Sequence, residues 1–219
     1  APVPSLALGT SEVTLLEITT AFATLANQGL RVFPTALASG SQGEAVEILP
    51  PPPPMRAVSA ESSFLVTHIL RGVMRDGTGR SSAGWGLSDI TAGKTGTTDG
   101  LRDAWFVGYT PDLVVGVWVG RDDGTPIGLD GAQAALPIWA SVMQAAVRRA
   151  PPKPFTPPPG VVLASIDRDT GRSVSFWCRG GTVIEEAFRA GTEPPSDCGE
   201  TPVAKAAGGF LDWLRNLFR

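Results

Sequence analysis

The sequence predicts an α/β (α+β) chain in which helices pack on an antiparallel sheet, followed by a small β-rich tail. Three observations lead to this expectation. Helical periodicity appears over 11–28, over 59–75 and from Pro137 to just before Pro151. Short apolar runs typical of strands lie between the second and third of these helices. A proline-rich stretch over 151–160 then separates two regions of the chain.

Composition restricts the classes of protein to which the chain can belong. Of its 219 residues, 42% are hydrophobic and 18% are charged, which excludes a disordered chain and leaves ample material for a core. The formal net charge of −3 argues against nucleic-acid binding through phosphate neutralisation. One histidine and two cysteines argue against a metal site rich in these residues. We therefore expect neither a nucleic-acid partner nor a bound metal.

The ends of the chain predict a segment of a longer protein. The first residues, Ala1 to Ser5, contain no initiator methionine and no basic-then-apolar signal segment. No apolar run is long enough to cross a membrane, so the chain as given is not expected to span one. We expect the cut to lie inside a larger protein.

Each predicted helix has an apolar stripe that we expect to face the core. The first helix is expected to have its cap at Thr10 or Ser11 and to end before Gly29. The stripes are Leu15, Ile18, Phe22, Leu25 and Ala26 in the first helix, Leu65, Ile69 and Val73 with Val66 and Leu70 alongside in the second, and Ile138, Trp139, Val142, Met143 and Ala146 in the third. His68 lies beside the second stripe, and we expect it to be half-buried and bonded to a neighbour rather than catalytic.

The sheet is expected to consist of three consecutive strands. They are predicted over Ile90–Thr98, Ala104–Tyr109 and Leu113–Arg121. A tight turn over 110–112 joins the last two, which indicates an antiparallel hairpin. Both faces of these two strands are apolar, so we expect helices to cover both sides of the sheet. A loose hairpin is plausible over 30–50, and the composition of 77–84 predicts a mobile loop.

The chain is expected to divide at its proline-rich linker. We predict a domain over 1–150, a linker over 151–160 and a tail over 161–219. Within the tail, 161–166 and 174–177 flank a turn and are expected to pair as a hairpin.

Two features of the tail have alternative interpretations. Cys178 and Cys198 lie in a loop-rich region, which favours a disulfide and an oxidising compartment, with two free thiols as the alternative. Residues 209–219 have bulky apolar side chains on one side of a short helix. This helix is expected either to bind a membrane or protein partner or to pack back onto its own domain, and the sequence favours neither.

Two chemistries compete for the stretch around Lys94. The first is a phosphate-binding P-loop, because Gly93-Lys94-Thr95 matches the end of that motif. However, Ser88 stands where the motif requires glycine, and the residues after Thr95 would not propagate a helix. We therefore disfavour a nucleotide-binding function.

The second chemistry is that of a Lys-Thr-Gly motif on an edge strand beside an acylating serine. A lysine ammonium can hold a substrate carboxylate in its field and help to move a proton from a nucleophile. Glycine lets another backbone approach the strand closely. Threonine hydroxyls can bond a carboxylate, and an outward N–H group can stabilise an oxyanion.

A longer string of motifs supports this second interpretation. The motifs are Pro4–Gly9, Glu12–Glu17, Arg71–Val73, Gly77–Arg80, Ala92–Thr98, Asp103–Pro111 and Val115–Gly120. In this order they resemble the C-terminal half of the transpeptidase domain of class A (bifunctional) penicillin-binding proteins, over residues 4 to about 148. The resemblance implies a partial penicillin-binding/serine β-lactamase-like fold. It also implies a serine acyltransferase that cross-links peptidoglycan stem peptides, is trapped by β-lactams and requires no metal or organic cofactor.

The resemblance assigns a role to each residue of the motif. Lys94 becomes the motif lysine, and Thr95 and Thr97 contact the carboxylate of the substrate or β-lactam. The Thr97 N–H becomes one donor of the oxyanion hole. Gly96 allows the close approach, and Thr98 extends the lining of the site.

The sequence also departs from the family pattern. No serine is followed by lysine three residues later or by asparagine two residues later, so the nucleophilic Ser-x-x-Lys and the Ser-x-Asn are both absent. The resemblance places these motifs, a glycosyltransferase domain and a membrane anchor upstream, at the periplasmic face of the bacterial inner membrane. The expected partners are therefore the missing N-terminal half, D-Ala-D-Ala stem peptides and β-lactams. A non-catalytic binding or scaffolding module is the alternative.

Overall fold

The computed structural model describes residues 4, 9, 11–35, 52–174 and 181–195. The chain divides into two compact units, Ala1–Pro158 and Pro159–Arg219, which are described separately here. Most of the predicted 30–50 hairpin, both cysteines and the predicted 209–219 helix lie outside the described residues. The domain, linker and tail ranges given above stay predictions.

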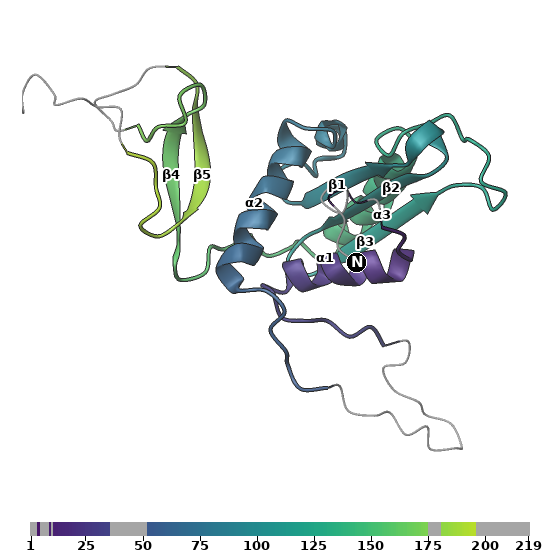
Figure 1. Cartoon of the computed structure of the whole chain (residues 1–219), viewed down its shortest axis with the longest axis horizontal. Helices are drawn as coiled ribbons and strands as arrows, with labels where there is room; N and C mark the ends of the chain where they lie inside the picture. The colour runs from purple at the N-terminus through teal and green to yellow at the C-terminus, as the bar shows by residue number, and fades with distance from the viewer. Residues whose placement is uncertain (1–3, 5–8, 10, 36–51, 175–180, 196–219) are drawn as a thin grey trace, which may run out of the picture. The chain divides into compact units, whose positions relative to one another are not determined.

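The first unit combines a three-stranded sheet with three α-helices (Figure 1). In chain order, its elements are α1 (Leu15–Ala26), α2 (Ala60–Arg75), the 3-10 helix η2 (Arg80–Trp85), β1 (Ala92–Thr97), the 3-10 turn η3 (Asp99–Leu101), β2 (Ala104–Tyr109), β3 (Val114–Val119) and α3 (Ala135–Arg149). The strands are antiparallel in the order β1-β2-β3, so the predicted hairpin between the last two is confirmed. The Thr110 N–H donates to the Leu113 carbonyl at 2.9 Å and closes that hairpin.

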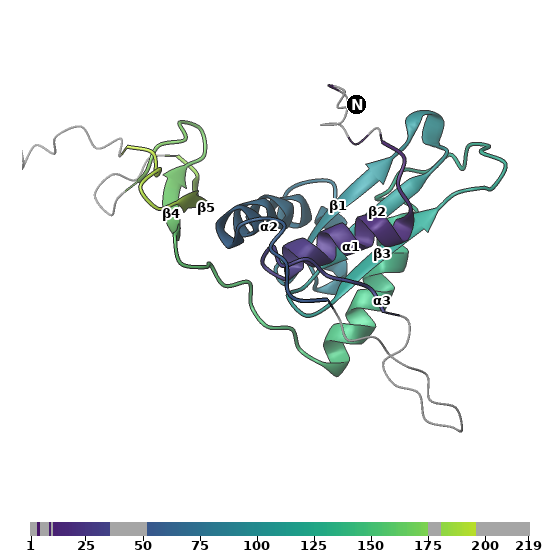
Figure 2. The same cartoon turned by 60° about the horizontal axis from the view of Figure 1, so that its bottom comes forward.

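Helices cover both faces of the sheet, as predicted from its apolar strands (Figure 2). On one face, α3 packs Leu136, Trp139 and Met143 against Phe106 and Val117. The Phe106 and Trp139 rings lie 4.7 Å apart. On the other face, a second cluster lies under α1 and α2, and its members are Phe22, Leu25, Ala26, Leu70, Ala92, Tyr109 and Val114.

The cap of α1 differs from the prediction. Thr14, not Thr10 or Ser11, is the N-cap, and its hydroxyl accepts from the Glu17 N–H at 3.2 Å. The Glu17 carboxylate in turn accepts from the Thr14 N–H at 2.8 Å, and this bond lowers the pKa of Glu17. The capping-box pattern Thr-x-x-Glu was the sequence signal for this start. The helix ends as expected, with Gly29 just beyond it at a φ of 82°.

The predicted inward stripes of α2 and α3 are partly wrong. Ile69 is 67% exposed and Val66 is 39% exposed, whereas Leu70 is buried as predicted. The other residues that α2 buries are Ser63, Phe64, Thr67, His68 and Met74. Polar members of this face find partners, because the Ser63 hydroxyl donates to the Leu25 carbonyl and the Thr67 hydroxyl bonds the Tyr109 hydroxyl. On α3, Trp139 and Met143 are buried, whereas Ile138 and Val142 are about half exposed. Each of these two precedes a buried residue by one position, which turns its side chain about 100° around the helix axis.

The segment predicted as a mobile loop over 77–84 is regular in the structure. Gly77 and Gly79 lie in a turn at the end of α2, where the Gly79 N–H donates to the Val73 carbonyl at 3.0 Å. The 3-10 helix η2 follows, and the Gln144 side chain donates to its Trp85 carbonyl. A high glycine content is equally typical of tight turns that pack against a helix, so the composition of 77–84 could not distinguish a mobile loop from such a turn.

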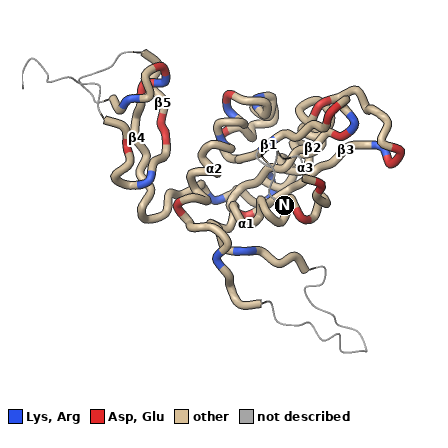
Figure 3. Tube along the Cα trace, in the orientation of Figure 1, with Lys and Arg blue, Asp and Glu red and all other residues tan. Residues whose placement is uncertain are grey.

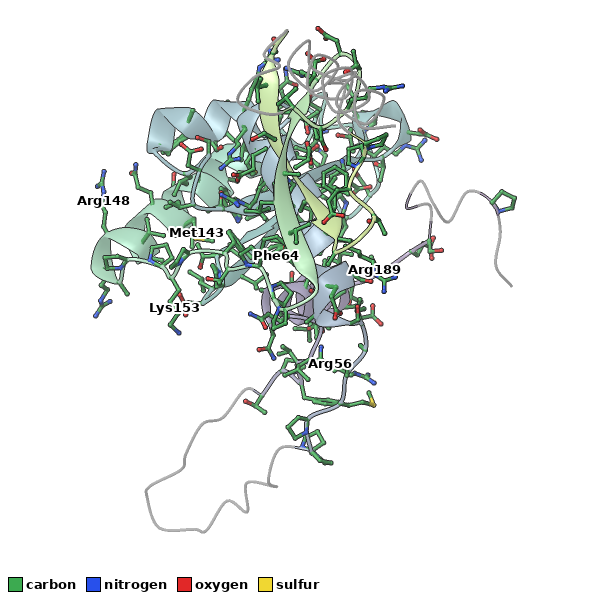
Figure 4. The ribbon with its side chains drawn as sticks, turned by 90° about the vertical axis from the view of Figure 1, so that its left-hand side faces the viewer. Arg56, Phe64, Met143, Arg148, Lys153 and Arg189 are labelled. Atoms are coloured by element: carbon green, nitrogen blue, oxygen red, sulfur yellow. The ribbon has the colours of Figure 1, made fainter. Side chains whose placement is uncertain are left out.

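The chain after α3 stays attached to the first unit. Arg148 projects outward from the last turn of α3, and Lys153 lies in the segment that follows (Figure 4). The Lys153 ammonium is 2.9 Å from the Asp112 carboxylate, which also accepts from the Lys153 N–H and has a lowered pKa as a result. Phe155 meets the Tyr109 ring edge to face at 5.9 Å. The proline-rich stretch is therefore docked at least as far as Phe155.

The second unit is a two-stranded antiparallel sheet of β4 (Val161–Asp167) and β5 (Val183–Arg189). The second strand of the predicted 161–166 with 174–177 hairpin lies outside the described residues from 175 onward, so this hairpin stays a prediction. In its described part, Ser173 forms a bridge with Ile166 and the Val174 N–H donates to the Ser165 carbonyl at 2.9 Å, while β5 pairs along the full length of β4.

Candidate functional site at the outer edge of β1

The outer edge of β1 presents backbone groups at two positions of the predicted motif. In the described sheet, β1 is an edge strand paired with β2 alone. The Thr98 N–H donates to the Asp103 carbonyl, just beyond the Thr97–Ala104 pair of the ladder. Because hydrogen-bonded pairs alternate in an antiparallel ladder, Gly96 and Lys94 also bond to β2. Thr95 and Thr97 therefore direct their N–H and C=O groups outward.

The side chains of β1 alternate between the two faces of the sheet. Lys94 lies on the α1 and α2 face, and its side chain is exposed. Its ammonium donates to the outward carbonyl of Thr95 at 2.8 Å. This bond holds a positive charge at the open edge of the strand, close to the outward N–H groups.

Gly96 lies between these groups at a crowded position. A Cβ at residue 96 would be 3.1 Å from the Cβ of Trp105, its partner on β2. Trp105 in turn packs against Trp118 on β3, with ring centroids 6.3 Å apart. Glycine thus leaves room for the Trp105 side chain beside the strand at the centre of the motif.

Thr97 is exposed and is held from the α3 face. Its hydroxyl accepts the Gly131 N–H at 3.1 Å, from the loop that precedes α3. A Cβ at residue 131 would lie 2.5 Å from the Trp105 carbonyl and 2.6 Å from the Gly96 carbonyl. Only glycine lets this loop support the back of β1 so closely. The sequence analysis did not identify Gly131.

Thr95 is half-buried, and its hydroxyl meets a second hydroxyl. The Thr95 and Thr78 oxygens are 2.8 Å apart, and Thr78 belongs to the turn between α2 and η2. The α2 helix also packs against β1 through Leu70 and Ala92. Two segments far apart in sequence therefore meet at the middle of the motif.

Thr98 lies just beyond β1 and closes the turn to β2. Its hydroxyl donates to the Asp103 carboxylate at 2.9 Å and accepts from the Asp103 N–H at the same distance. The other carboxylate oxygen of Asp103 accepts from the indole N–H of Trp118 at 3.0 Å. The structure thus connects Thr98 to the turn, and Asp103 links that turn to β3.

The remaining predicted features lie apart from this edge. His68 is buried on α2, with its ring stacked on that of Phe64. Lys and Arg residues are dispersed along the described backbone among Asp and Glu residues (Figure 3). Among the described residues, no three His, Cys, Asp or Glu side chains gather as a metal site, and no helix is long and apolar enough to cross a membrane.

The geometry of the edge suits binding of a carbonyl or carboxylate group. An ammonium, two outward N–H groups and two threonine hydroxyls lie within four consecutive residues, 94–97, of one edge strand. N–H groups aimed outward from a rigid strand are suited to stabilise a developing oxyanion, and hydroxyls with an ammonium are suited to hold a carboxylate.

Comparisons with known proteins show the family to which the chain belongs. Residues 3–144 match the family described as penicillin binding protein transpeptidase domain. The chain is 36% identical over 211 residues to penicillin-binding protein 1A of Aquifex aeolicus, which covers 91% of this chain and 27% of that protein.

Solved structures show the same similarity. Penicillin-binding protein 1A from Haemophilus influenzae is 28% identical, with a TM-score of 0.71 over 87% of this chain and 34% of its own. The PonA1 protein from Mycobacterium tuberculosis, solved in complex with penicillin V, is 25% identical, with a TM-score of 0.54 over 72% of this chain and 44% of its own. The chain thus spans about a quarter of that curated relative and less than half of either solved chain.

Proposed function

Because this chain belongs to the penicillin binding protein transpeptidase domain family, we propose that it is the C-terminal part of that domain in a bifunctional peptidoglycan synthase. The proposed activity is that of a serine D,D-transpeptidase at the periplasmic face of the bacterial inner membrane. Its substrates are stem peptides that end in D-Ala-D-Ala, and β-lactams are its inhibitors. The observation that supports this most directly is the Lys94 ammonium beside the outward backbone of Thr95 and Thr97.

The reaction consists of two acyl transfers. A serine hydroxyl attacks the carbonyl of the penultimate D-alanine, the peptide bond breaks and D-alanine leaves with a proton on its nitrogen. The amine of a second stem peptide then attacks the acyl-serine, forms the cross-link and returns the hydroxyl to serine. Because the chain contains neither Ser-x-x-Lys nor Ser-x-Asn, we propose that an N-terminal segment of the same protein supplies the nucleophile.

The residues of the β1 edge then have separate roles. The Thr97 N–H stabilises the oxyanion that forms when the carbonyl is attacked. The Thr95 and Thr97 hydroxyls bind the terminal carboxylate of the substrate. Lys94 supplies positive charge next to that carboxylate and assists proton movement from the nucleophile. Gly96 keeps the strand narrow enough for the substrate backbone to lie alongside it, and Thr98 ends the lining.

The test is mass spectrometry of covalent adducts after incubation with a penicillin. We expect no stable adduct on this chain alone and one penicilloyl adduct on the full-length synthase. In the full-length protein, Lys94→Ala should slow acylation by about 10²–10⁴-fold, the range for a positioned proton-transfer group. Thr97→Val should weaken carboxylate recognition by roughly tenfold or less, because its backbone N–H survives.

Lys153→Ala is the matched control for Lys94→Ala. Lys153 pairs with Asp112 next to the β2–β3 turn, and its loss should leave acylation unchanged. An adduct on this chain alone would place the nucleophile within it and refute the proposal. Equal acylation rates for the Lys94 and Lys153 variants would refute the role given to Lys94.

A further inference from the structure

We infer that Thr78 is a positioning residue for carboxylate recognition, because its hydroxyl orients the hydroxyl of Thr95. The inference rests on the proposed function, in which Thr95 binds the substrate carboxylate. It adds a residue from the turn between α2 and η2 to a site otherwise formed by β1. The two hydroxyl oxygens are 2.8 Å apart, the usual separation for an O–H···O hydrogen bond.

The turn that bears Thr78 is held tightly in place. A Cβ at Gly77 would be 2.8 Å from the Val73 Cα, so this residue packs directly onto the last turn of α2. The following glycine, Gly79, donates its N–H to the Val73 carbonyl at 3.0 Å. Thr78 therefore lies between two glycines whose missing side chains let the turn close against the helix.

A buried methionine links this turn to β1. The Met74 side chain is fully buried, and its sulfur would be 2.8 Å from a Cβ at Gly79 and 3.1 Å from a Cβ at Gly93. The sulfur is thus lodged between a glycine of the turn and a glycine of the strand. This packing sets the distance between Thr78 and Thr95, because neither segment can move toward or away from the other without displacing Met74.

The direction of the hydroxyl pair follows from proton count. A threonine hydroxyl has a single proton to donate and two lone pairs to accept with. When the Thr95 hydroxyl donates its hydrogen bond to a carboxylate, the Thr95 oxygen can only act as acceptor in its bond with Thr78. Thr78 then donates to Thr95, and Thr95 donates to the carboxylate. Hydrogen bonds in such a chain polarise one another, and the bond to the charged acceptor gains most.

This arrangement predicts an effect that depends on the charge of the ligand. Thr78 is exposed, so its replacement by valine keeps the branched shape of the side chain and removes only the hydroxyl. Without that donor, Thr95 is no longer held with its proton toward the ligand. An anionic carboxylate should lose more from this change than a neutral ester, because charge-assisted hydrogen bonds are roughly twice as strong as neutral ones.

The experiment measures acylation of the full-length synthase by a penicillin and by the methyl ester of the same penicillin. Thr78→Val should lower the second-order rate constant for the acid by about fivefold to tenfold, through weaker initial binding, and should change that for the ester less than about twofold. Thr78→Ser should restore the rate for the acid. Ser81→Ala removes an exposed hydroxyl three residues away and should change neither rate.

The outcomes separate this inference from the function on which it rests. If the unsubstituted protein forms no adduct, the proposed function fails, and the inference fails with it. Suppose instead that the unsubstituted protein forms the adduct. If Thr78→Val then has the wild-type acylation rate constants, or lowers those for the acid and the ester equally, only the inference is overturned. Thr78→Ala serves as a second hydroxyl-free variant, and thermal unfolding checks that both are folded. A normal rate in a folded Thr78→Ala variant would also overturn the inference.

Discussion

Gly131 donates its backbone N–H to the hydroxyl oxygen of Thr97 across 3.1 Å, and this bond ties the loop before α3 to the edge strand β1. The loop reaches Thr97 only because residue 131 has no side chain: a Cβ there would lie within 2.6 Å of the Trp105 and Gly96 carbonyls. The hydroxyl that we assign to carboxylate binding is thus oriented from behind by a backbone group. The conformation of this loop is therefore part of the site.

Replacing Gly131 by alanine should disturb both stability and the site. The added methyl group collides with backbone atoms, which cannot rotate away as a flexible side chain can, so we expect a loss of about 1–3 kcal/mol in the free energy of unfolding. Urea unfolding of the full chain measures this loss. Gly72→Ala is the control, because a Cβ there has open space within α2 and should stabilise the chain by about 0.5–1 kcal/mol. Equal midpoints for the two variants would contradict the prediction.

The single tyrosine of the chain should titrate at unusually high pH. Burial raises the pKa of the Tyr109 hydroxyl to about 12, despite its hydrogen bond with Thr67. The raised value means that the folded state favours the neutral phenol. This contribution to stability is complete below the unfolded pKa of about 10 and is lost as the pH rises through about 12.

Ultraviolet absorbance of tyrosinate measures this titration directly, because no other tyrosine contributes. We expect a midpoint near 12 in the native chain, accompanied by unfolding, and near 10 in concentrated urea. Identical midpoints in the two solvents would show that the Tyr109 hydroxyl is accessible to water in the native state.

The cysteine pair of the tail should form one intramolecular disulfide. Cys178 and Cys198 lie outside the described residues, so this expectation still rests on the sequence. The disulfide would close the loop from Cys178 to Cys198, and in the chain-entropy model a loop of about 20 residues adds about 3 kcal/mol to the free energy of unfolding. Mass spectrometry after alkylation without reductant should find no modified thiol on the oxidised protein, and two after reduction. Two modified thiols before reduction would exclude the bond.

Local patterns in the sequence were sufficient for much of the first unit. The bounds of β2 and the extent of α2 follow from apolar runs and helical periodicity, because these patterns act within a few residues. The turn over 110–112 determined the β2–β3 hairpin in the same way. The Lys94 motif was placed on an edge strand because the Lys-Thr-Gly motif that it resembles lies on one.

The tertiary structure decided which faces and segments meet. The buried face of α2 contains Ser63 and Thr67, which no hydrophobic pattern selects, because they are buried only where the Leu25 carbonyl and the Tyr109 hydroxyl are present to bond them. The partner of β4 is likewise β5, beyond the reach of a local turn rule.

The same division holds for the candidate site. The residues of the motif could be identified from the sequence, because the string of motifs between Pro4 and Gly120 resembles a family whose pattern assigns a role to each of them. The residues that hold the motif in place could not be identified from the sequence. Thr78 lies 17 residues from its partner Thr95, and Gly131 lies 34 residues from its partner Thr97. A hydroxyl or a glycine is common in any loop. It gains a role only when the packing of Met74 and of the loop before α3 brings it within hydrogen-bond distance of β1.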